Sequence, residues 1–401
     1  MKIVHLETAY TGMGNAVIRL HEMLLNNGYD SVVLNQESAI VNDTILEIKR
    51  NNKIKGYFNR KFCGLSLLGK LSNSYYYSPD ALFRFNIIRN QEVKDADCIC
   101  LHWTHGLFLN LGDIEDLCKL EKPVVIFFHD KWYMTGGCNH NFECRGFLND
   151  CKNCPMFKWK KLSPYIQFSR KKNLYTKYRN LYFVNFSHWM DRCFMETGIY
   201  QGNNHFVISP LIDDTVFHPI QKEYARKELN LPANKEYISF GSVSSLTNEY
   251  KGAPFLFDAI KKLKKRRNIH LIMFGSEKKI DIGIPYTSFG IVKDEHLMSL
   301  VNSASDVYVA PSLAESYGMA VMENLLCGTP VVAFKTASMP ELVEDKQNGY
   351  LAEYKNSQDL CQGINYVLDN IRENNFKMPD YSTKRESDAY IRFFNSLKIK
   401  D

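Results

Sequence analysis

The sequence Ala310-Pro-Ser-Leu-Ala-Glu-Ser-Tyr-Gly-Met-Ala-Val-Met-Glu-Asn-Leu-Leu-Cys-Gly-Thr-Pro-Val-Val-Ala333 indicates how this chain folds. Its pattern predicts a strand that ends at Ala310, a short polar loop, and a helix that begins near Gly318. Gly328 is placed to cap the carboxyl end of that helix, and Pro330 prevents the helix from continuing into the next strand. A strand, loop, helix and strand in this order are typical of a parallel α/β sheet.

The same alternation of strands and helices extends outward along the chain in both directions. Short apolar runs predict buried strands at 1–6, 31–34, 97–102, 123–129, 182–187, 206–209, 237–241, 270–275, 307–310 and 330–334. Helical periodicity appears between them at 15–27, 254–265 and 295–303. Such alternation predicts parallel sheets covered by helices on both faces. The expected fold class is therefore α/β, with two doubly wound Rossmann-like domains facing across a cleft.

The boundary between the two domains is expected near 210–232, where three prolines interrupt a polar stretch. We expect an N-terminal domain over 1–212 and a C-terminal domain over 213–378. The remaining segment, 379–401, contains a helical pattern that is compatible with either domain, including packing back onto the N-terminal one. Ligands of doubly wound sheets bind beyond the carboxyl ends of the strands, so the cleft between the domains is the expected site.

Composition narrows the class of protein further. The chain has 401 residues, of which 45% are hydrophobic and 23% charged, as in ordinary globular proteins. It begins directly in a strand-like run, and its longest apolar run near a strand, Val124–Phe128, is far too short to span a membrane. Eleven cysteines, an odd number, favour reduced thiols. We expect a cytoplasmic protein that is neither secreted nor membrane-spanning, with contact to the inner face of the plasma membrane left open.

Two glutamates in the quoted stretch suit the chemistry of a nucleotide sugar. Glu315 lies in the loop and Glu323 on the second helical turn, with the backbone N–H groups of 317–319 between them at a helix N-terminus. Those amides would bind the diphosphate, one carboxylate a sugar hydroxyl and the other a ribose diol. The alternative interpretation is a solvated Glu323 and a Glu315 that merely favours the helix dipole.

The stretch resembles the signature of the family 4 retaining glycosyltransferases, which have the GT-B fold. Their pattern is a glutamate, seven residues and a second glutamate, with Phe-Gly or Tyr-Gly after the first. The resemblance extends over most of the chain, at 11–14, 210–219, 240–241, 251–252 and 288–292. It implies a donor site formed by Gly14, Gly241, Ser242, Lys251, Ile291, Val292, Glu315, Ser316, Tyr317, Gly318, Met319 and Glu323.

One residue departs from the family pattern. Members commonly have an arginine directly after the glycine that matches Gly241, and this chain has Ser242. Lys251 is then the evident cation for the diphosphate, although a lysine carries charge without the bidentate fork of arginine. The alternative interpretation of Lys251 is an ordinary exposed lysine before a helix.

The buried strand over 123–129 ends in His129 and Asp130. By the resemblance, His129 is the active-site histidine that contacts the donor sugar, so the expected catalytic residues are His129, Glu315 and Lys251. His102 and His105 follow the preceding strand and are expected, with Asp130, to bind the acceptor. Asp130 is the one candidate for a nucleophilic carboxylate, and the resemblance implies front-face substitution without a metal cofactor instead. A structural role for each of these polar side chains is the alternative.

Four cysteines, Cys138, Cys144, Cys151 and Cys154, lie close together within an expected insertion at about 135–156. A structural zinc ion held by four thiolates would stabilise a loop with little apolar content. Free or reversibly bridged thiols are an equally supported interpretation, and His140 could replace one cysteine. An insertion of this kind resembles a subgroup of bacterial polysaccharide-assembly transferases.

The net charge of +6 is unevenly distributed. Two segments, 48–79 and 151–190, contain no acidic residue, and each mixes lysines and arginines with aromatic side chains. This composition favours an anionic lipid surface as a partner of the N-terminal half. Solvated helix faces are the alternative, and nucleic acid is a weaker one because no nucleic-acid motif accompanies the charge.

Together these patterns predict a retaining glycosyltransferase that moves a sugar from a nucleotide-sugar donor to a saccharide acceptor. The expected setting is capsule, exopolysaccharide or other bacterial surface polysaccharide biosynthesis, with a lipid-linked acceptor. A non-catalytic nucleotide-sugar or glycan-binding scaffold would bind without turnover. A sugar-nucleotide epimerase of the same fold would change the donor sugar without requiring an acceptor.

Overall fold

The computed structural model divides the chain into two compact units, which are described separately. The N-terminal unit comprises Met1–Pro210 and Ser387–Asp401, and the C-terminal unit comprises Leu211–Glu386. The structure describes residues 1–10, 16–38, 40–50, 53–66, 77–158, 162–241, 246, 248–263, 268–277, 280–371 and 375–397. Gly14 and Ser242, both predicted at the donor site, lie outside the described residues.

The N-terminal unit is built on a parallel sheet with seven strands among the described residues, in the order β3-β2-β1-β4-β5-β6-β7. The strands are β1 (Lys2–Tyr10), β2 (Asp30–Ser38), β3 (Ile45–Glu47), β4 (Cys98–Leu101), β5 (Val124–Phe128), β6 (Leu181–Asn185) and β7 (His205–Val207). The central strands β4, β5 and β6 are buried throughout, as expected for parallel strands covered on both faces. Chain order reverses between β1 and β4, which lie side by side.

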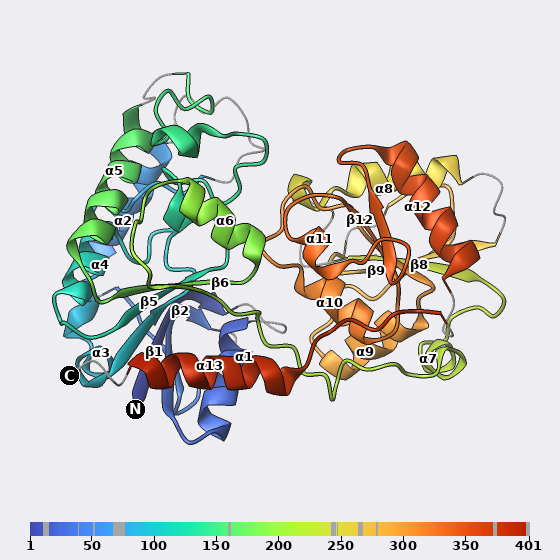
Figure 1. The fold of residues 1–401 in the computed structure, drawn as a ribbon, viewed down its shortest axis with the longest axis horizontal. Coiled ribbons are helices and arrows are strands. Elements are labelled where there is room, and N and C mark those ends of the chain that lie inside the picture. Colours follow the sequence, from blue (N-terminus) through green and yellow to red (C-terminus); the bar gives the residue numbers. More distant parts are fainter. Residues whose placement is uncertain are drawn as a thin grey trace. The chain divides into compact units, whose positions relative to one another are not determined.

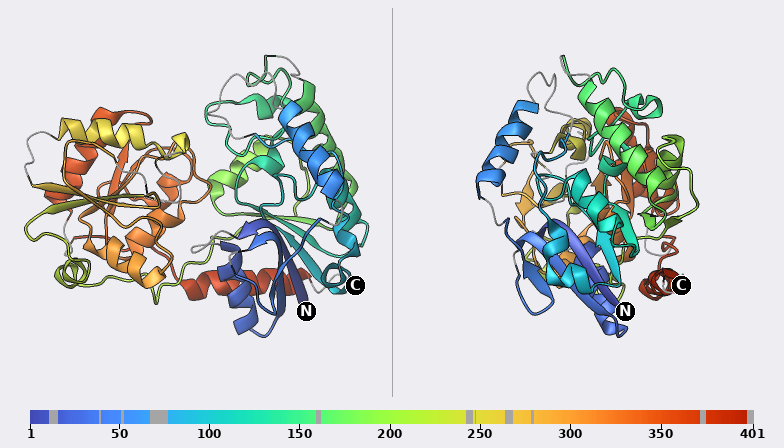
Figure 2. Two further views of the ribbon diagram at one scale, coloured as in Figure 1. Left: turned by 180° about the vertical axis from the view of Figure 1, so that it is seen from behind. Right: turned by 90° about the vertical axis from the view of Figure 1, so that its left-hand side faces the viewer.

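Helices cover both faces of this sheet (Figures 1 and 2). They are α1 (Ala16–Asn26), α2 (Lys53–Ser66), α3 (Gln91–Asp95), α4 (Leu111–Cys118), α5 (Leu162–Lys177), α6 (His188–Glu196) and the C-terminal α13 (Thr383–Leu397). Helix α13 packs on the N-terminal unit, because Tyr390 lies near Phe127 of β5 and Phe393 near Phe206 of β7. The last helix of the chain thus belongs with the first half of the sequence.

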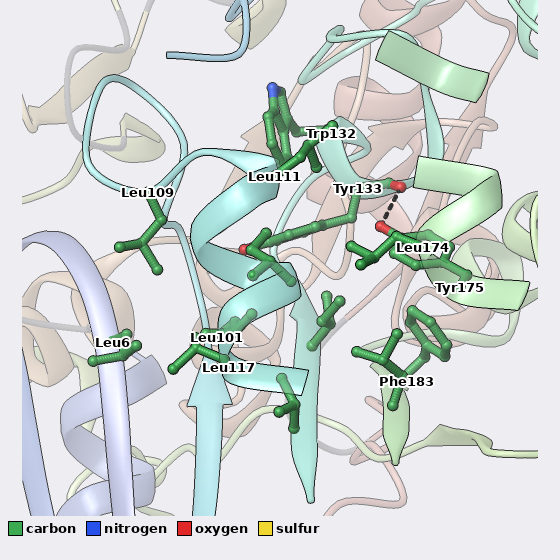
Figure 3. Packing of buried hydrophobic residues seen from close by; sticks show 14 of the residues in the cluster. Leu6, Leu101, Leu109, Leu111, Leu117, Trp132, Tyr133, Leu174, Tyr175 and Phe183 are labelled. Atoms are coloured by element: carbon green, nitrogen blue, oxygen red, sulfur yellow. Dashed lines mark hydrogen bonds between the residues drawn. The ribbon is translucent and has the colours of Figure 1, made fainter. Parts of the chain in front are cut away.

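Successive side chains of a strand point to opposite faces of the sheet, so the two faces form separate core contacts. On one face, residues such as Leu101 and Phe183 join Leu117 of α4 and Leu174 of α5 in the main core (Figure 3). The hydroxyl of Tyr175 in the same core donates a hydrogen bond of 2.9 Å to a backbone carbonyl. The opposite face carries Phe127, so α13 lies on the other side of the sheet from α4 and α5.

The C-terminal unit repeats the plan with a parallel sheet of six described strands, in the order β10-β9-β8-β11-β12-β13. They are β8 (Glu236–Gly241), β9 (Ile269–Phe274), β10 (Tyr286–Ser288), β11 (Val307–Ala310), β12 (Val331–Phe334) and β13 (Gly349–Ala352). Its helices are α7 (Lys222–Glu228), α8 (Ala253–Lys262), α9 (Glu295–Ala304), α10 (Met319–Leu326), α11 (Met339–Leu342) and α12 (Ser357–Asn370). In Figure 1, α8 and α12 cover one face of the sheet, and α9 and α10 cover the other.

The predicted α/β class with two doubly wound sheets is confirmed. All ten predicted strands are present, with shifts of a few residues at their ends. The sequence did not predict β3, β10 and β13, which are short and lie at or next to sheet edges. No helix in the described part of the chain is both long and apolar enough to cross a membrane.

Candidate functional site

The C-terminal unit brings its predicted donor residues together where the order of its strands reverses. From β8 the chain proceeds to β9 and β10 on one side, and then crosses back to β11, which pairs with the other side of β8. Loops leaving β8 and β11 therefore diverge at the carboxyl ends of these strands, which is where doubly wound sheets usually bind ligands. The segment after β8 carries Lys251, and the segment after β11 carries Glu315.

These two side chains form an ion pair, with Lys251 Nζ 2.6 Å from Glu315 Oε1. Both are mostly enclosed, with side-chain exposures of 16% and 19%. Burial by itself lowers the pKa of Lys251, but Glu315 and Tyr250 together outweigh burial and hold that pKa above its ordinary value. Lys251 is therefore a fixed cation beside the carboxyl ends of these strands. The interpretation as an ordinary exposed lysine is wrong.

Backbone contacts hold the two segments together. The N–H of Leu313 donates to the carbonyl of Tyr250 at 2.7 Å. Gly252 begins α8 with φ +73°, and a Cβ at this position would overlap the carbonyl oxygen of Pro311. Only glycine combines a left-handed backbone with such a close approach. This contact places Lys251 beside the loop that contains Glu315.

Helix α10 begins at the same place. Gly318 is its N-cap with φ +106°, and no side chain caps the helix. Buried Ser338 fixes the preceding loop, because its hydroxyl donates to the carbonyl of Tyr317 at 2.6 Å. The first amides of an α-helix have no intrahelical acceptor, and the helix dipole makes this end attractive to anions. The amides that begin at Met319 therefore lie close to Glu315, while Tyr317 is buried and Ser316 half-buried.

The second glutamate is near the first. Burial raises the pKa of Tyr308 on β11, and the carboxylates of Glu315 and Glu323 raise it further, so both lie within electrostatic reach of this phenol. The Tyr308 hydroxyl donates to the carbonyl of Gly241 at 2.8 Å, which joins the end of β8 to the same cluster. A Cβ on Gly241 would overlap the backbone of Phe274, so glycine is required there as well.

The predicted base-binding turn follows β10. Gly290 has φ +60°, and its carbonyl accepts a 2.6 Å hydrogen bond from the N–H of Gly275 after β9. Ile291 comes next, with 53% of its surface exposed, and Val292 is half-buried. The turn thus lies at the carboxyl edge of the same sheet as Lys251.

In the N-terminal unit, His102 follows β4 and His129 follows β5, and their rings are hydrogen-bonded. His102 Nδ1 is 2.9 Å from His129 Nε2, and His102 Nε2 is 2.9 Å from Nδ1 of His5 on β1. Burial lowers the pKa of His129 to about 4 and that of His5 to about 3. It also lowers the pKa of His102 well below its usual range. All three rings are therefore neutral at pH 7. The sequence prediction did not include His5, whose signal was a polar residue inside an apolar strand.

Asp130 and His105 form a separate buried cluster. His105 Nε2 is 3.0 Å from Asp130 Oδ2, which also accepts a 2.7 Å hydrogen bond from the Trp103 indole N–H. The backbone N–H of Trp132 donates to Asp130 Oδ1 at 2.8 Å. Burial raises the pKa of Asp130 to about 7, against the opposing effects of this N–H and of nearby Lys171. These contacts support a structural role for Asp130 and His105.

Lys171 on α5 is a further residue that the sequence prediction missed. Its side chain is fully buried, and its ammonium nitrogen lies 3.6 Å from the ring centroid of Trp132. It donates to the carbonyl oxygens of Thr135, at 2.9 Å, and of Trp132. Burial lowers the pKa of Lys171 to about 7. Lys171 thus stabilises the loop that leads to the cysteine cluster.

The four clustered cysteines are free thiols in the structure. Cys138 and Cys154 pack with Tyr77 in a small apolar cluster, and Cys151 accepts a 3.1 Å hydrogen bond from the N–H of Gly136. Burial raises the pKa of Cys151 to about 12, which favours the thiol. Within the described ranges, no group of three or more His, Cys, Asp or Glu side chains is placed to hold a metal ion. The structural zinc stays a prediction, and metal analysis of the purified protein tests it.

The two basic segments differ in how their charges are used. In the second, the cations pair within the unit, as Arg170 does with Asp80 at 2.6 Å and Lys177 with Glu115 at 2.8 Å. In the first, the Arg50 guanidinium donates to four backbone carbonyls of 83–84 and 107–108. Much of the basic charge therefore stabilises the fold, which leaves α2 as the main candidate for an anionic partner.

Comparison with known proteins shows which class of protein the C-terminal unit resembles. Residues 238–370 match the family described as "Glycosyl transferases group 1". This range includes Lys251, Glu315 and Glu323, so the match falls on the residues of the candidate donor site. The implied resemblance to glycosyltransferases is confirmed for this unit.

Curated relatives match the sequence over part of the chain. A D-inositol 3-phosphate glycosyltransferase of Mycobacteroides abscessus is 27% identical over 177 residues, which are 40% of this chain and 38% of the relative. An uncharacterized glycosyltransferase of Haemophilus influenzae is 28% identical over 149 residues, covering 34% and 40% of the two chains. The alignments thus span about two fifths of the length of these relatives.

Solved structures extend the likeness of fold to both units. HepE of Anabaena, solved in complex with UDP, has a TM-score of 0.66 at 16% identity, with 99% of this chain and 100% of HepE covered. Sucrose-phosphate synthase of Thermosynechococcus elongatus has a TM-score of 0.65 at 13% identity, with 99% and 100% covered. At these identities the likeness establishes the fold, which is that of the GT-B glycosyltransferases.

Proposed function

We propose that this protein is a retaining glycosyltransferase that moves a sugar from a nucleotide-sugar donor to a saccharide acceptor. The observation that carries the proposal is the cluster of Lys251, Glu315 and the amino end of α10 at the strand-order reversal of the C-terminal unit. A cation and unpaired amides suit a diphosphate, and carboxylates suit sugar hydroxyls. The group 1 match over the same residues supports the assignment.

The chemistry follows from where negative charge develops. When the bond between sugar and diphosphate breaks, charge accumulates on the leaving diphosphate, and Lys251 and the α10 amides would stabilise it without a metal ion. Neutral His129 would donate a hydrogen bond to an oxygen of the transferred sugar. The leaving phosphate would help to take the proton of the acceptor hydroxyl. The resemblance of the Glu315 and Glu323 block to retaining enzymes supports retention of the anomeric configuration.

A thermal-shift panel with UDP, GDP, ADP, dTDP and CMP, with and without magnesium, tests donor binding. UDP is the first probe, because the structurally similar HepE was solved with UDP and with UDP-glucose. We expect one nucleotide to stabilise the protein, and its sugar conjugates then to give product whose anomeric configuration NMR determines. Glu315→Ala and Glu323→Ala should abolish the shift, while Glu228→Ala, at an exposed site on α7, should not.

The proposal fails if no product forms with matched donor and acceptor and the two glutamate variants bind nucleotide as well as Glu228→Ala does. Binding without turnover would instead favour the non-catalytic scaffold. A changed donor sugar that needs no acceptor would favour an epimerase.

We further propose that the acceptor is lipid-linked, as in bacterial surface polysaccharide biosynthesis, and that helix α2 contacts an anionic membrane surface. Five large apolar side chains of α2 are between 38% and 68% exposed: Ile54, Tyr57, Phe58, Phe62 and Leu65. The helix carries four cations and no acid. Asn59, on its buried side, holds the helix to the unit through a 2.8 Å hydrogen bond from the N–H of Phe83. Apolar and basic side chains directed to solvent suit the interface of a bilayer.

Co-sedimentation with phosphatidylglycerol vesicles tests this contact, with phosphatidylcholine vesicles for comparison. We expect binding to the anionic vesicles only, weakened by salt and by Phe58→Ser. Tyr224→Ser is the matched control, because Tyr224 is a similarly exposed aromatic residue (52%) on α7 of the other unit. Equal binding of both variants would contradict a role for α2.

A further inference from the structure

A chain of three histidines runs through the sheet of the N-terminal unit. His5 is in β1, His102 follows β4 and His129 follows β5, and these strands are neighbours. The two ring-to-ring hydrogen bonds are both 2.9 Å. His5 and His102 are 0% and 1% exposed, and His102 is also stacked on Phe127 at a centroid distance of 4.6 Å. The three hydrogen-bonded histidine rings thus extend from fully buried His5 to half-buried His129.

Hydrogen-bond chemistry allows only two proton arrangements in such a chain. A neutral imidazole carries one N–H and one bare nitrogen, so each ring that accepts a hydrogen bond on one side must donate on the other. In the first arrangement every ring has its proton on Nε2, and the bonds run from His129 towards His5. In the second, every ring has its proton on Nδ1, and the bonds run from His5 towards His129. The tautomers of the three rings are therefore coupled.

The buried end of the chain distinguishes the two arrangements. His5 Nε2 has no hydrogen-bond partner in the described part of the protein. The first arrangement would leave a buried N–H without an acceptor, whereas the second leaves only a bare nitrogen lone pair. Unpaired buried N–H groups are the rarer of the two. The second arrangement is favoured, and it makes His129 Nε2 the acceptor from His102 and leaves the proton of His129 on Nδ1.

We propose that His5 and His102 are positioning residues that hold His129 as the Nδ1–H tautomer, a fixed hydrogen-bond donor. This inference rests on the proposed glycosyl transfer, in which His129 donates to an oxygen of the transferred sugar. A donor whose proton is already in place needs no tautomer exchange when charge develops in the transition state. Imidazole side chains in water favour the Nε2–H form, so the protein selects the less common tautomer.

NMR of the intact protein tests the tautomers without any activity measurement. Long-range ¹H–¹⁵N spectra of histidine-labelled protein distinguish a protonated from a bare ring nitrogen for each of the 11 histidines. Assignment uses the signals lost in His129→Gln, His102→Gln and His5→Asn. We expect Nδ1–H signatures for all three rings of the chain at neutral pH. An Nε2–H signature for His129 in the wild-type protein overturns the proposal.

An isosteric pair of variants at His5 tests the coupling. His5→Asn retains a donor near the position of Nδ1, so His129 should stay in the Nδ1–H form. His5→Asp offers an acceptor to His102, which should reverse both hydrogen bonds and convert His129 to the Nε2–H form. The reversal should lower kcat on the order of a hundredfold with little change in KM for the donor. His5→Asn should stay within about twofold of wild type.

A matched control separates positioning from loss of stability. His21→Leu removes another buried histidine of the same unit, whose ring nitrogens bond to Ser31 and Thr44. It should lower stability and leave the tautomer of His129 unchanged. If His5→Asp and His5→Asn give the same tautomer, the coupling is wrong. If the wild-type protein shows the expected tautomers but transfers no sugar, the proposed function fails while the coupled chain stands.

Discussion

At the scale of single residues, the ion pair of Lys251 and Glu315 would serve both stability and the proposed nucleotide binding, and experiments can separate the two. Replacing one partner leaves the other charge mostly buried without compensation, which is more costly than losing both. We expect Lys251→Met to lower the free energy of unfolding by about 2 kcal/mol, less than for a fully buried pair because each side chain retains some exposure. It should also abolish nucleotide binding. Urea unfolding and titration calorimetry measure the two effects.

The double variant Lys251→Met with Glu315→Gln, measured beside both single variants, completes a double-mutant cycle. Because it removes both charges, it should recover about half of the stability lost in Lys251→Met, and with Glu315→Gln alone costing about as much as Lys251→Met the coupling energy is about 3 kcal/mol. Nucleotide binding should not recover, since the cation for the diphosphate is still missing. Strictly additive losses of stability would show that the 2.6 Å contact contributes nothing, and binding by the double variant would remove Lys251 from the donor site.

Lys171 makes stability depend on pH. Burial lowers its folded-state pKa to about 7 from the ordinary 10.5. Between these values the unfolded chain binds a proton that the folded protein does not, so stability rises with pH. Relative to Lys171→Met, the wild-type protein should gain stability from about pH 7 to about pH 10, with a slope approaching 1.4 kcal/mol per pH unit. Guanidinium unfolding across this range measures the difference.

The neighbouring lysine gives the control for this prediction. Lys172→Met removes the same charge from a side chain that is 42% exposed, so its unfolding across the same pH range is the control. A difference between wild type and Lys171→Met that stays constant from pH 7 to pH 10 would mean that Lys171 remains protonated inside the fold. Its ammonium over the Trp132 ring would then be a permanent buried cation.

At the scale of elements, two glycines separate backbone strain from close packing. Gly252 and Gly283 both have φ +73°, but only Gly252 lies against another segment, the backbone of Pro311. An alanine at either position is strained by roughly 1 kcal/mol. Gly252→Ala must in addition push apart the segments that carry Lys251 and Glu315. We expect it to cost at least about 2 kcal/mol more than Gly283→Ala and to weaken nucleotide binding, which Gly283→Ala should not.

Denaturant unfolding and nucleotide titration of both variants measure this difference. Equal costs for the two variants would show that the approach of Gly252 to Pro311 relaxes without loss. Normal nucleotide binding by Gly252→Ala would show that the position of Lys251 does not depend on this contact.

The same elements show how far sequence can predict this molecule. The strand, loop and helix over 310–326 were predictable because glycine and proline mark their ends within a few residues. The strands β3 and β10 were not, because three residues at a sheet edge have no period to recognise. His5 lies 97 residues from His102, and Lys171 lies 36 from Thr135. His5 is marked locally only as a polar residue in an apolar strand, and the roles of His5 and Lys171 arise from distant contacts that no local pattern encodes.

At the scale of the whole molecule, the main hydrophobic cores of the two units share no residue in the part of the chain that the structure describes. One core joins β1 to β6 with α4, α5 and α6, and the other joins β8 to β13 with α8 and α12. The chain leaves the first unit at Pro210 and returns to it at Ser387, so the C-terminal unit is inserted within the N-terminal one. Separate cores predict two unfolding transitions that can shift independently.

Nucleotide binding should therefore stabilise one transition and leave the other in place. Lys171→Met should shift the transition of the N-terminal unit and Gly252→Ala should lower that of the C-terminal unit, so the two variants assign the transitions. At about one hundred times its dissociation constant, the bound nucleotide adds about 2.7 kcal/mol to the unit that holds it. This amounts to about 5–10 °C for a unit of this size.

In differential scanning calorimetry with the nucleotide, only the transition lowered by Gly252→Ala should rise. A rise of both transitions would mean that the nucleotide engages both units, and a rise of the other transition alone would move the donor site away from Lys251 and Glu315.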